Sequence, residues 1–219
     1  MIGHRLLPLG VFVIAGLSLI GVASAAPGPK AAFKPDMGPD RAVAIFAGGC
    51  FWCMEEAYDA IDGVTATIDG YTGGHLADPS YEDVTAETSG HAEAVKVVYD
   101  PKKVSYRHLL DVFWHNVDPT DDGGQFCDRG DSYRSEIFAV NDRQLAQARQ
   151  SKQALESDPQ APTPIKTSIV YATTFYRAED YHQNYHQNNP LRYKFYSNAC
   201  GRYQRLDELW GDAARTPVS

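Results

Sequence analysis

The sequence predicts an α/β protein that folds as a two-layer sandwich on a mixed β-sheet. Two observations support this class. Short apolar or alternating segments of strand length are interleaved with segments whose apolar residues recur at helical spacing. The connections vary in length and several strands follow one another directly, which favours a mixed sheet over a doubly wound parallel one.

Each element has its own signature. The strands are short runs or alternations rich in β-branched residues, and we expect them at residues 42–46, 64–68, 91–99, 135–140 and 165–172. The helices show apolar residues at i, i+3, i+4 and i+7, and we expect them at residues 50–61, 105–117, 141–156 and 179–187. Ser105 and Asn141 are residue types that favour helix N-caps.

Four further stretches lack a regular period. Residues 70–74 form a glycine-rich break, and the chain from residue 188 onward is polar, aromatic and expected to be an irregular tail. Residues 75–90 and 118–134 are long polar stretches. Loops of this length inside a compact domain are often functional.

The N-terminal segment, residues 1–25, indicates a secretory signal peptide. A weakly basic head precedes an apolar run over residues 6–22, and Ala23-Ser24-Ala25 has the small residues that a signal peptidase recognises. A membrane anchor is the alternative, but the run is short for a span and no basic stop-transfer patch follows it. We therefore expect an exported, periplasmic protein that begins near Ala26.

The rest of the chain divides into a linker and one domain. Residues 26–40 are rich in proline and glycine and are expected to be a linker, and residues 41–212 suit a single domain. The net charge of −8 argues against nucleic acid or an anionic membrane as the main partner. We expect a monomer.

The segment Ala47–Glu56 carries the strongest chemical signal. Two glycines separate the first strand from a helix that begins at Cys50. The positive end of a helix dipole favours a thiolate over a thiol, so Cys50 is a candidate nucleophile. The position of Cys50 alone fits a structural cysteine equally well. Cys53 completes a C-x-x-C pair around Phe51 and Trp52, whose faces suit a methyl group or a sulfur.

Glu93 is unusual for its place in a strand. Along residues 91–99 it shares a face with Val95, Val97 and Tyr99, which is the expected core face. An arginine could pair with it there. A buried carboxyl without such a partner has a raised pKa and can donate a proton near neutral pH.

The other polar candidates have simpler explanations when taken alone. Tyr81 and Tyr133 lie in the long polar stretches, where tyrosines are usually surface residues, and Asp128 suits a turn. His91 with Glu93, and His182 with His186, invite a metal hypothesis, but no metalloprotease-type spacing exists. We expect no metal and no cofactor.

Five motifs in order resemble the type A peptide-methionine sulfoxide reductases over residues 41–200. They are Gly49-Cys50-Phe51-Trp52, Gly70-Tyr71-Thr72-Gly73-Gly74, Tyr81, Gly90-His91-Ala92-Glu93, and the segment from Asp128 to Tyr133-Arg134-Ser135. The resemblance implies a two-layer α/β sandwich, and we expect an α+β chain with a ferredoxin-like core, long loops and the irregular tail. It also implies reduction of the S epimer of methionine sulfoxide, free or in oxidised proteins, as a repair of oxidative damage.

The resemblance also implies roles for residues of this chain. Cys50 would be the nucleophile and Glu93 the acid that protonates the sulfoxide oxygen. Phe51 and Trp52 would hold the S-methyl group. The remaining catalytic candidates, which would hydrogen-bond near the oxygen or shape the site, are Tyr81, Tyr133 and Asp128.

A second thiol must then convert the Cys50 sulfenic acid into a disulfide. The family commonly uses a cysteine of a mobile C-terminal tail, which points to Cys200, with Cys53 and Cys127 as alternatives. A dithiol reductant must reopen the disulfide. Because export removes the protein from cytosolic thioredoxin, we expect a thioredoxin-like or membrane-delivered thiol donor.

Two other functions compete. A disulfide oxidoreductase using Cys50 and Cys53 would not need Glu93. An exported binding domain would carry the disulfides Cys50–Cys53 and Cys127–Cys200 and no cycling thiol. Neither explains a glutamate on an apolar strand face.

Overall fold

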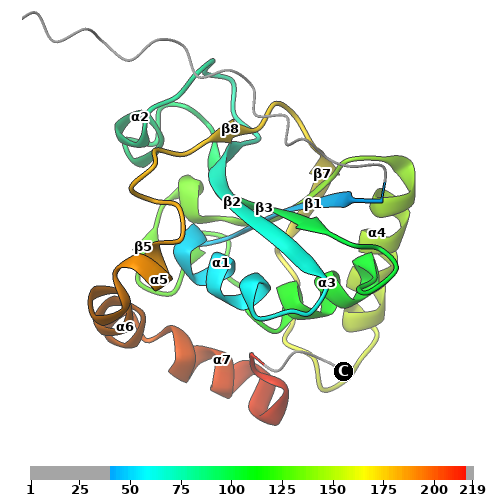
Figure 1. Ribbon diagram of the computed structural model, residues 1–219. Helices are drawn as coiled ribbons and strands as arrows, with labels where there is room; N and C mark the ends of the chain where they lie inside the picture. The colour runs from blue at the N-terminus through cyan, green and yellow to red at the C-terminus, as the bar shows by residue number, and fades with distance from the viewer. Residues whose placement is uncertain (1–39, 216–219) are drawn as a thin grey trace, which may run out of the picture.

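The computed structural model describes residues 40–215, and Figure 1 shows a central sheet with helices packed against it. The expected signal peptide and nearly all of the expected linker lie outside these residues. Within residues 40–215, no helix combines the length and the apolar character needed to cross a membrane.

The core has the βαββαβ order of a ferredoxin-like fold. Its elements are β1 (Ala42–Gly48), α1 (Phe51–Asp59), β2 (Val64–Thr72), β3 (Ala92–Tyr99), α3 (Tyr106–Trp114) and β6 (Ser135–Ala139). The four strands lie in the order β6-β1-β3-β2, and all neighbours are antiparallel. The edge strand β7 (Ser168–Tyr171) is parallel to β6, and β8 (Tyr176–Arg177) is antiparallel to β2. The predicted mixed sheet and ferredoxin-like core are confirmed.

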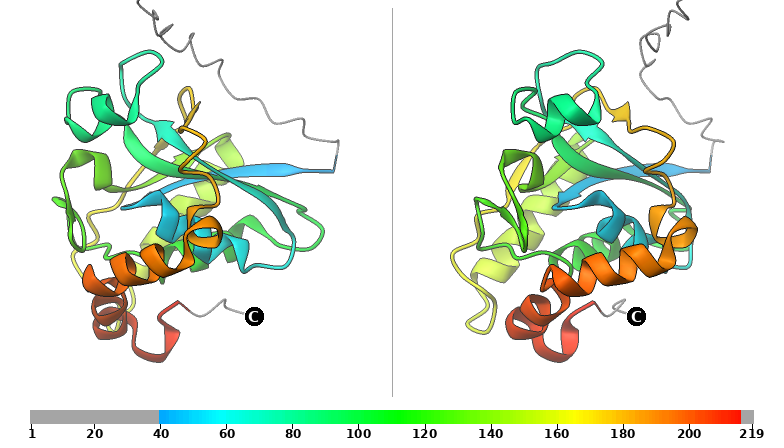
Figure 2. Two further views of the ribbon diagram at one scale, coloured as in Figure 1. Left: turned by 60° about the vertical axis from the view of Figure 1, so that its left-hand side comes forward. Right: turned by 90° about the vertical axis from the view of Figure 1, so that its left-hand side faces the viewer.

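The other elements surround this core. They are α2 (Tyr81–Thr85), β4 (Gly124–Gln125), β5 (Asp128–Arg129), the 3-10 turn η1 (Asp131–Tyr133), α4 (Asp142–Glu156), α5 (Tyr185–Asn188), α6 (Pro190–Ala199), α7 (Arg202–Trp210) and the 3-10 turn η2 (Gly211–Ala213). In Figure 2 the C-terminal helices, in orange and red, lie beside α1.

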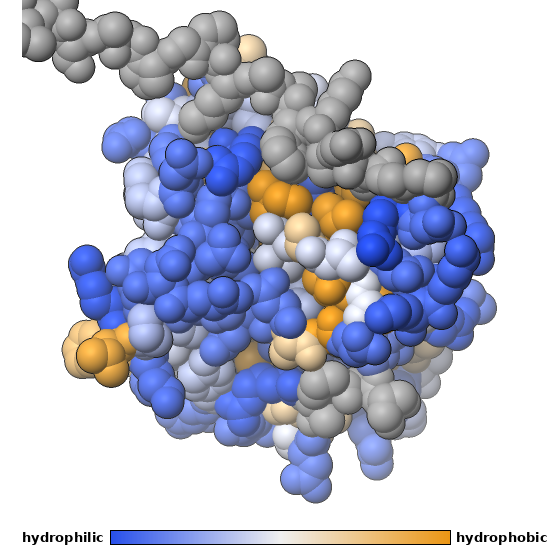
Figure 3. All heavy atoms as spheres, viewed as in Figure 1, coloured by the Kyte–Doolittle hydropathy of each residue, from blue (hydrophilic) through white to orange (hydrophobic). Residues whose placement is uncertain are grey.

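The larger hydrophobic core lies between the sheet and α1, α3 and α4. Phe46 is fully buried at its centre, and its ring stacks on those of Tyr58, Tyr106 and Phe113. The predicted alternation of β3 is confirmed, because Val95, Val97 and Tyr99 belong to this core whereas Ala92, Ala94 and Val98 belong to a smaller cluster. Viewed as in Figure 1, the surface is mostly hydrophilic around a group of apolar residues (Figure 3).

Strand β2 is longer than the sequence pattern predicts. It runs through Gly70, Tyr71 and Thr72, which we expected to form a break. Gly70 is needed there because a Cβ would lie 2.3 Å from the carbonyl oxygen of Tyr176 and 2.4 Å from the Phe175 ring. The glycine therefore permits the close approach of β8 and does not end the strand.

Both long polar stretches contain short elements. In the first, Ser80 and Asp83 form a reciprocal capping box that begins α2. The second folds into the β4–β5 hairpin and η1. The side chain of Glu87 joins the two stretches, because its carboxylate accepts hydrogen bonds from the backbone N–H and the hydroxyl of Ser132.

The C-terminal tail is helical, which corrects the expectation of an irregular tail. Glu55 of α1 accepts hydrogen bonds from the backbone N–H groups of Asn184 and Tyr185. Glu56 accepts a bond from the Tyr193 hydroxyl at 2.7 Å. Long-range contacts with α1 thus order a segment whose own apolar pattern is weak.

Phe46→Ala tests the central position of the Phe46 ring in the larger hydrophobic core. We expect the free energy of unfolding to fall by about 3–5 kcal/mol, because a buried aromatic side chain is lost and a cavity remains. Urea unfolding measures it. Val170→Ala on edge strand β7, where the side chain is 38% exposed, is the control and should change stability by about 0.5 kcal/mol or less. Equal losses in the two variants would contradict this account of the core.

Candidate active site

Cys50 is placed by a sharp turn between β1 and α1. It is the N-cap of α1, with Phe51 as the first helical residue. Gly49 precedes it with a φ of +81°, and a Cβ at that position would lie 2.6 Å from Gln125. The positive φ and the close packing both require glycine. The predicted location of Cys50, between a strand and a helix, is confirmed.

One small pocket of about 70 Å³ brings the sequence candidates together. Its walls combine α1, α2, β3 and the 118–134 segment with α6. The lining residues are Cys50, Phe51, Trp52, Tyr81, Glu93, Asp128, Tyr133 and Tyr196. The volume suits the end of a side chain, such as a methyl group and a neighbouring polar atom.

Glu93 is a buried acid at this pocket. Its side chain is 2% exposed, and one carboxylate oxygen accepts a hydrogen bond from the backbone N–H of Phe51 at 3.1 Å. Burial, as the largest effect, raises the pKa of Glu93 to about 8, although the Phe51 N–H opposes the shift. No Lys or Arg of residues 40–215 forms an ion pair with it, so the expected neutral acid is present at pH 7.

Cys50 and Cys53 form a hydrogen-bonded pair of free thiols. Cys50 is the N-cap and Cys53 is the third helical residue, two positions whose side chains face each other at a helix start. The two thiols therefore face each other at the N-terminal end of α1.

The ionisation of this pair differs from the expected low pKa of Cys50. Burial, as the largest effect, and the neighbouring Cys53 raise the pKa of Cys50 well above its ordinary value, although the hydrogen bond with Tyr196 opposes the shift. The bond with Cys50 and the charge of Arg202 lower the pKa of Cys53 to about 7, against the effect of its burial. At neutral pH the pair thus readily loses one proton, which Cys53 gives up more easily.

Two aromatic side chains give the pocket rigid walls. Phe51 is 1% exposed and packs with Tyr71, Val84 and Ala178. Trp52 stacks on Tyr185 of α5 with 3.7 Å between the ring centroids. The sequence did not reveal this partner, which fixes the indole against the C-terminal segment.

The tyrosines and Asp128 form the polar side of the pocket. The Tyr81 and Tyr133 hydroxyls interact with each other, and burial raises the pKa of Tyr81 to about 12. Burial is also the largest cause of the raised pKa of Tyr133. Both phenols are therefore neutral hydrogen-bond donors at pH 7. Asp128 accepts a hydrogen bond from the Tyr196 hydroxyl at 2.5 Å.

Tyr196 is the pocket residue that sequence reasoning missed. It lies in α6, four residues before Cys200, so the two side chains share one face of the helix. Its hydroxyl also interacts with the Cys50 thiol. A helical reading of the tail would have placed Tyr196 beside Cys200, but the weak apolar pattern concealed the helix.

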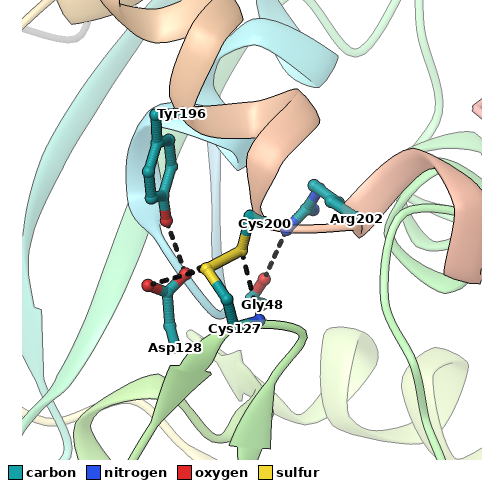
Figure 4. Close-up of a disulfide and its surroundings, with 6 residues drawn as sticks. All are labelled: Gly48, Cys127, Asp128, Tyr196, Cys200 and Arg202. Atoms are coloured by element: carbon teal, nitrogen blue, oxygen red, sulfur yellow. Dashed lines mark hydrogen bonds between the residues drawn. A yellow bond between two sulfur atoms is a disulfide. The ribbon is translucent and has the colours of Figure 1, made fainter.

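The remaining two cysteines form a disulfide next to the pocket. Cys127 of the β4–β5 turn is bonded to Cys200, the C-cap residue of α6. Figure 4 shows Asp128 and Tyr196 on one side of the disulfide and Gly48 with Arg202 on the other. The Arg202 guanidinium donates to the carbonyl oxygen of Gly48 and, at 2.5 Å, to that of Asn116. Cys200 thus lies in an anchored segment, in place of the mobile tail expected from the resemblance.

The histidines considered for a metal have other contacts. The His91 ring accepts from the backbone N–H of Gly74 and contacts the carbonyl oxygen of Leu76. His182 packs against the rings of Phe51 and Trp52, and His186 pairs with Asp59.

Comparisons with known proteins agree with this geometry. The profile of the family "Peptide methionine sulfoxide reductase" matches residues 42–214. Peptide methionine sulfoxide reductase MsrA 2 of Caulobacter vibrioides is 51% identical over 173 residues, which cover 79% of this chain and 87% of that protein. The MsrA of Bacillus subtilis is 46% identical over 175 residues, covering 80% of this chain and 99% of that protein.

Solved structures show the same relationship. The reduced form of Mxr1 from Saccharomyces cerevisiae has a TM-score of 0.66 at 32% identity, covering 70% of this chain and 89% of that one. Methionine sulfoxide reductase A of Corynebacterium diphtheriae has a TM-score of 0.65 at 29% identity, covering 75% and 84%.

Glu93→Gln tests the buried acid through stability. The pKa of Glu93 is about 8 in the folded protein against an ordinary value of 4.5, so the folded state holds a proton that the unfolded state releases between these values. Wild type should therefore lose stability relative to Glu93→Gln as the pH rises from about 4.5 to 8, because glutamine cannot ionise.

Urea unfolding at several pH values measures this difference. Glu156→Gln, at the exposed end of α4, is the control for the exchange of a glutamate for a glutamine. A constant difference between wild type and Glu93→Gln across the range would show that Glu93 ionises normally in the folded protein.

Proposed function

The chain belongs to the peptide methionine sulfoxide reductase family, and from this premise we propose that it reduces the S epimer of methionine sulfoxide, in proteins and as the free amino acid, at Cys50. The observation that carries the assignment of the site is the single pocket that holds a thiol, a neutral buried acid and two aromatic walls. The biological role is repair of oxidised methionine.

The reaction needs an acid because a sulfoxide sulfur is a poor electrophile until its oxygen is protonated. Glu93 donates that proton, and the neutral Tyr81 and Tyr133 hydroxyls hold the oxygen. Phe51 and Trp52 receive the S-methyl group and so orient the sulfur.

The nucleophile is the Cys50 sulfur, which attacks the substrate sulfur. The S–O bond of the substrate and the transient bond between the two sulfurs then break as the oxygen passes to Cys50, which leaves a Cys50 sulfenic acid and free methionine. The Cys50 thiol is protonated at rest because of burial. Its proton leaves through the hydrogen-bonded Cys53, whose pKa is about 7.

The sulfenic acid is then converted into an intramolecular disulfide. From the sequence Cys200 is the preferred resolving residue. The geometry adds support for Cys53, which is the free thiol hydrogen-bonded to Cys50 while Cys200 is bonded to Cys127. A dithiol reductant of the thioredoxin-like or membrane-delivered class reopens the disulfide.

Turnover of separate S and R epimers with dithiothreitol tests the reaction. We expect methionine from the S epimer only. Cys50→Ser should abolish turnover, and Glu93→Gln should lower it by about 100-fold or more because a general acid is lost. Asp69→Asn removes an equally buried acid of β2 that does not line the pocket, and it is the matched control for Glu93→Gln.

The same assay separates the rival functions. A disulfide oxidoreductase would reduce protein disulfides and keep that activity in Glu93→Gln. A binding domain held by disulfides would turn over neither epimer, and that result from the intact protein would end the reductase proposal.

Export is a separate proposal that rests on residues 1–25 of the sequence. Expression in a Gram-negative bacterium, followed by fractionation and mass spectrometry, tests it. We expect a periplasmic, monomeric protein that begins near Ala26. A chain that stays in the cytoplasm with residues 1–25 attached would contradict both the export and the external thiol donor.

A further inference from the structure

A second pocket, of about 280 Å³, adjoins the cysteine pair at the start of α1. Cys53 lines this second pocket, whereas Cys50 lines the substrate pocket, and the two pockets share no lining residue. Among the residues around the second pocket, Cys53 and Arg202 are buried, whereas Ala60 and Arg215 are exposed. The second pocket therefore connects the buried Cys53 thiol with the surface.

A chain of hydrogen bonds leads from Cys50 to the second pocket. Cys50 is bonded to Cys53, and Cys53 is bonded to the hydroxyl of Tyr193. The three side chains pack in one buried cluster. The Tyr193 hydroxyl donates to the Glu56 carboxylate at 2.7 Å, and Glu56 lines the second pocket. Since a phenol has one proton to donate and lone pairs that accept, Tyr193 can accept from Cys53 while it donates to Glu56.

We propose that the Glu56 carboxylate receives the proton of the cysteine pair. The proton that Cys50 loses on attack is passed on through Cys53 and Tyr193, and Glu56 releases it by way of the second pocket. This inference rests on the reductase function proposed above and extends the path of the proton beyond Cys53. Glu56 does not line the substrate pocket, so it acts only through Tyr193 and Cys53.

The steps balance as proton transfers. As the Cys50 sulfur attacks, its proton moves to Cys53. Cys53 passes its own proton to the Tyr193 oxygen, and Tyr193 passes its proton to Glu56, which releases one proton to solvent. Glu93 gives one proton to the sulfoxide oxygen and takes one back from solvent. Methionine and the Cys50 sulfenic acid thus form with no net change in protons, and no electrons travel along the chain.

Tyr193 transmits the proton without becoming charged. Burial, as the largest effect, raises the pKa of Tyr193, so the phenol takes up one proton as it gives up another. The Tyr203 hydroxyl donates to the same oxygen of Glu56 at 3.3 Å. The charged and titratable groups around the chain, besides its own members, are Asp69, Glu93, Asp128, Arg202, Tyr203 and Arg215.

An anchor for the C-terminal segment is the alternative role of Glu56, and pH separates the two roles. The pKa of Cys53 is about 7. At pH 6 Cys53 carries a proton, which it must pass on before it can accept the proton of Cys50. At pH 8 the Cys53 thiolate accepts that proton directly, so the rest of the chain is not needed. An anchor, by contrast, matters equally at both pH values.

The test measures the rate of methionine formation from the S epimer in a single turnover, with reduced protein in excess. Glu56→Gln keeps an oxygen that accepts from Tyr193 but cannot take up the proton. We expect wild type to be faster than Glu56→Gln by about 10-fold or more at pH 6 and equally fast at pH 8. The ratio of the two rates is compared, because loss of the Glu93 proton slows both proteins at high pH.

Two phenylalanine variants show which hydroxyl carries the proton. Tyr193→Phe removes a link of the chain and should show the same loss at pH 6 as Glu56→Gln. Tyr203→Phe is the matched control, since Tyr203 lines the same pocket and bonds to Glu56 but is not a link between Cys53 and Glu56. Tyr203→Phe should match wild type at both pH values.

Rescue by a small carboxylate gives a second measurement. Glu56→Ala leaves room in the second pocket, where formate should restore the rate at pH 6 and chloride at the same ionic strength should not. A ratio of wild type to Glu56→Gln that is the same at both pH values would overturn the proton path while the reductase stands. No recovery with formate would overturn it as well. No methionine from wild type would overturn the proposed function itself.

Discussion

A carboxyl group kept from water and from cations retains its proton, and Glu93 is held in that condition by its place in the sheet. Strand β3 lies between β1 and β2, so neither edge of it is open to solvent. The backbone N–H of Phe51 is the contact that opposes protonation, and it also links the acid to the first turn of α1. The position of the Glu93 carboxyl relative to the Cys50 sulfur is therefore fixed by the pairing of β3 with its neighbouring strands and by this hydrogen bond to α1.

The C-terminal segment packs against this part of the site. Glu55 and Glu56 on α1 bind it from one side, and Arg202 binds the Gly48 backbone from the other. These anchors place Tyr196 in the wall of the pocket and Cys200 beside it. The same burial that protects the neutral acid raises the pKa of Cys50. The site thus favours a protonated acid at the expense of a free thiolate at Cys50.

The four cysteines lie in two pairs at different depths. Sulfoxide reduction gains from a dry pocket, because desolvation keeps the acid neutral. Exchange with an external dithiol needs an accessible sulfur. Of the four cysteines, Cys53 is buried at the start of α1 and Cys127 is exposed in the β4–β5 turn, far away in the chain.

The sequence by itself determined the local features of this protein. It predicted the strands and helices with a strong period, Cys50 at a helix start, and Glu93 on the apolar face of β3, because each depends on neighbours within a few residues. The tertiary structure decided the rest. The helices of the tail, the role of Tyr196, the extension of β2 past Gly70 and the Cys127–Cys200 disulfide all rest on contacts between distant segments. The ionisation of Cys50 belongs with them, since the helix dipole is a local effect whereas desolvation is set by everything packed around the thiol.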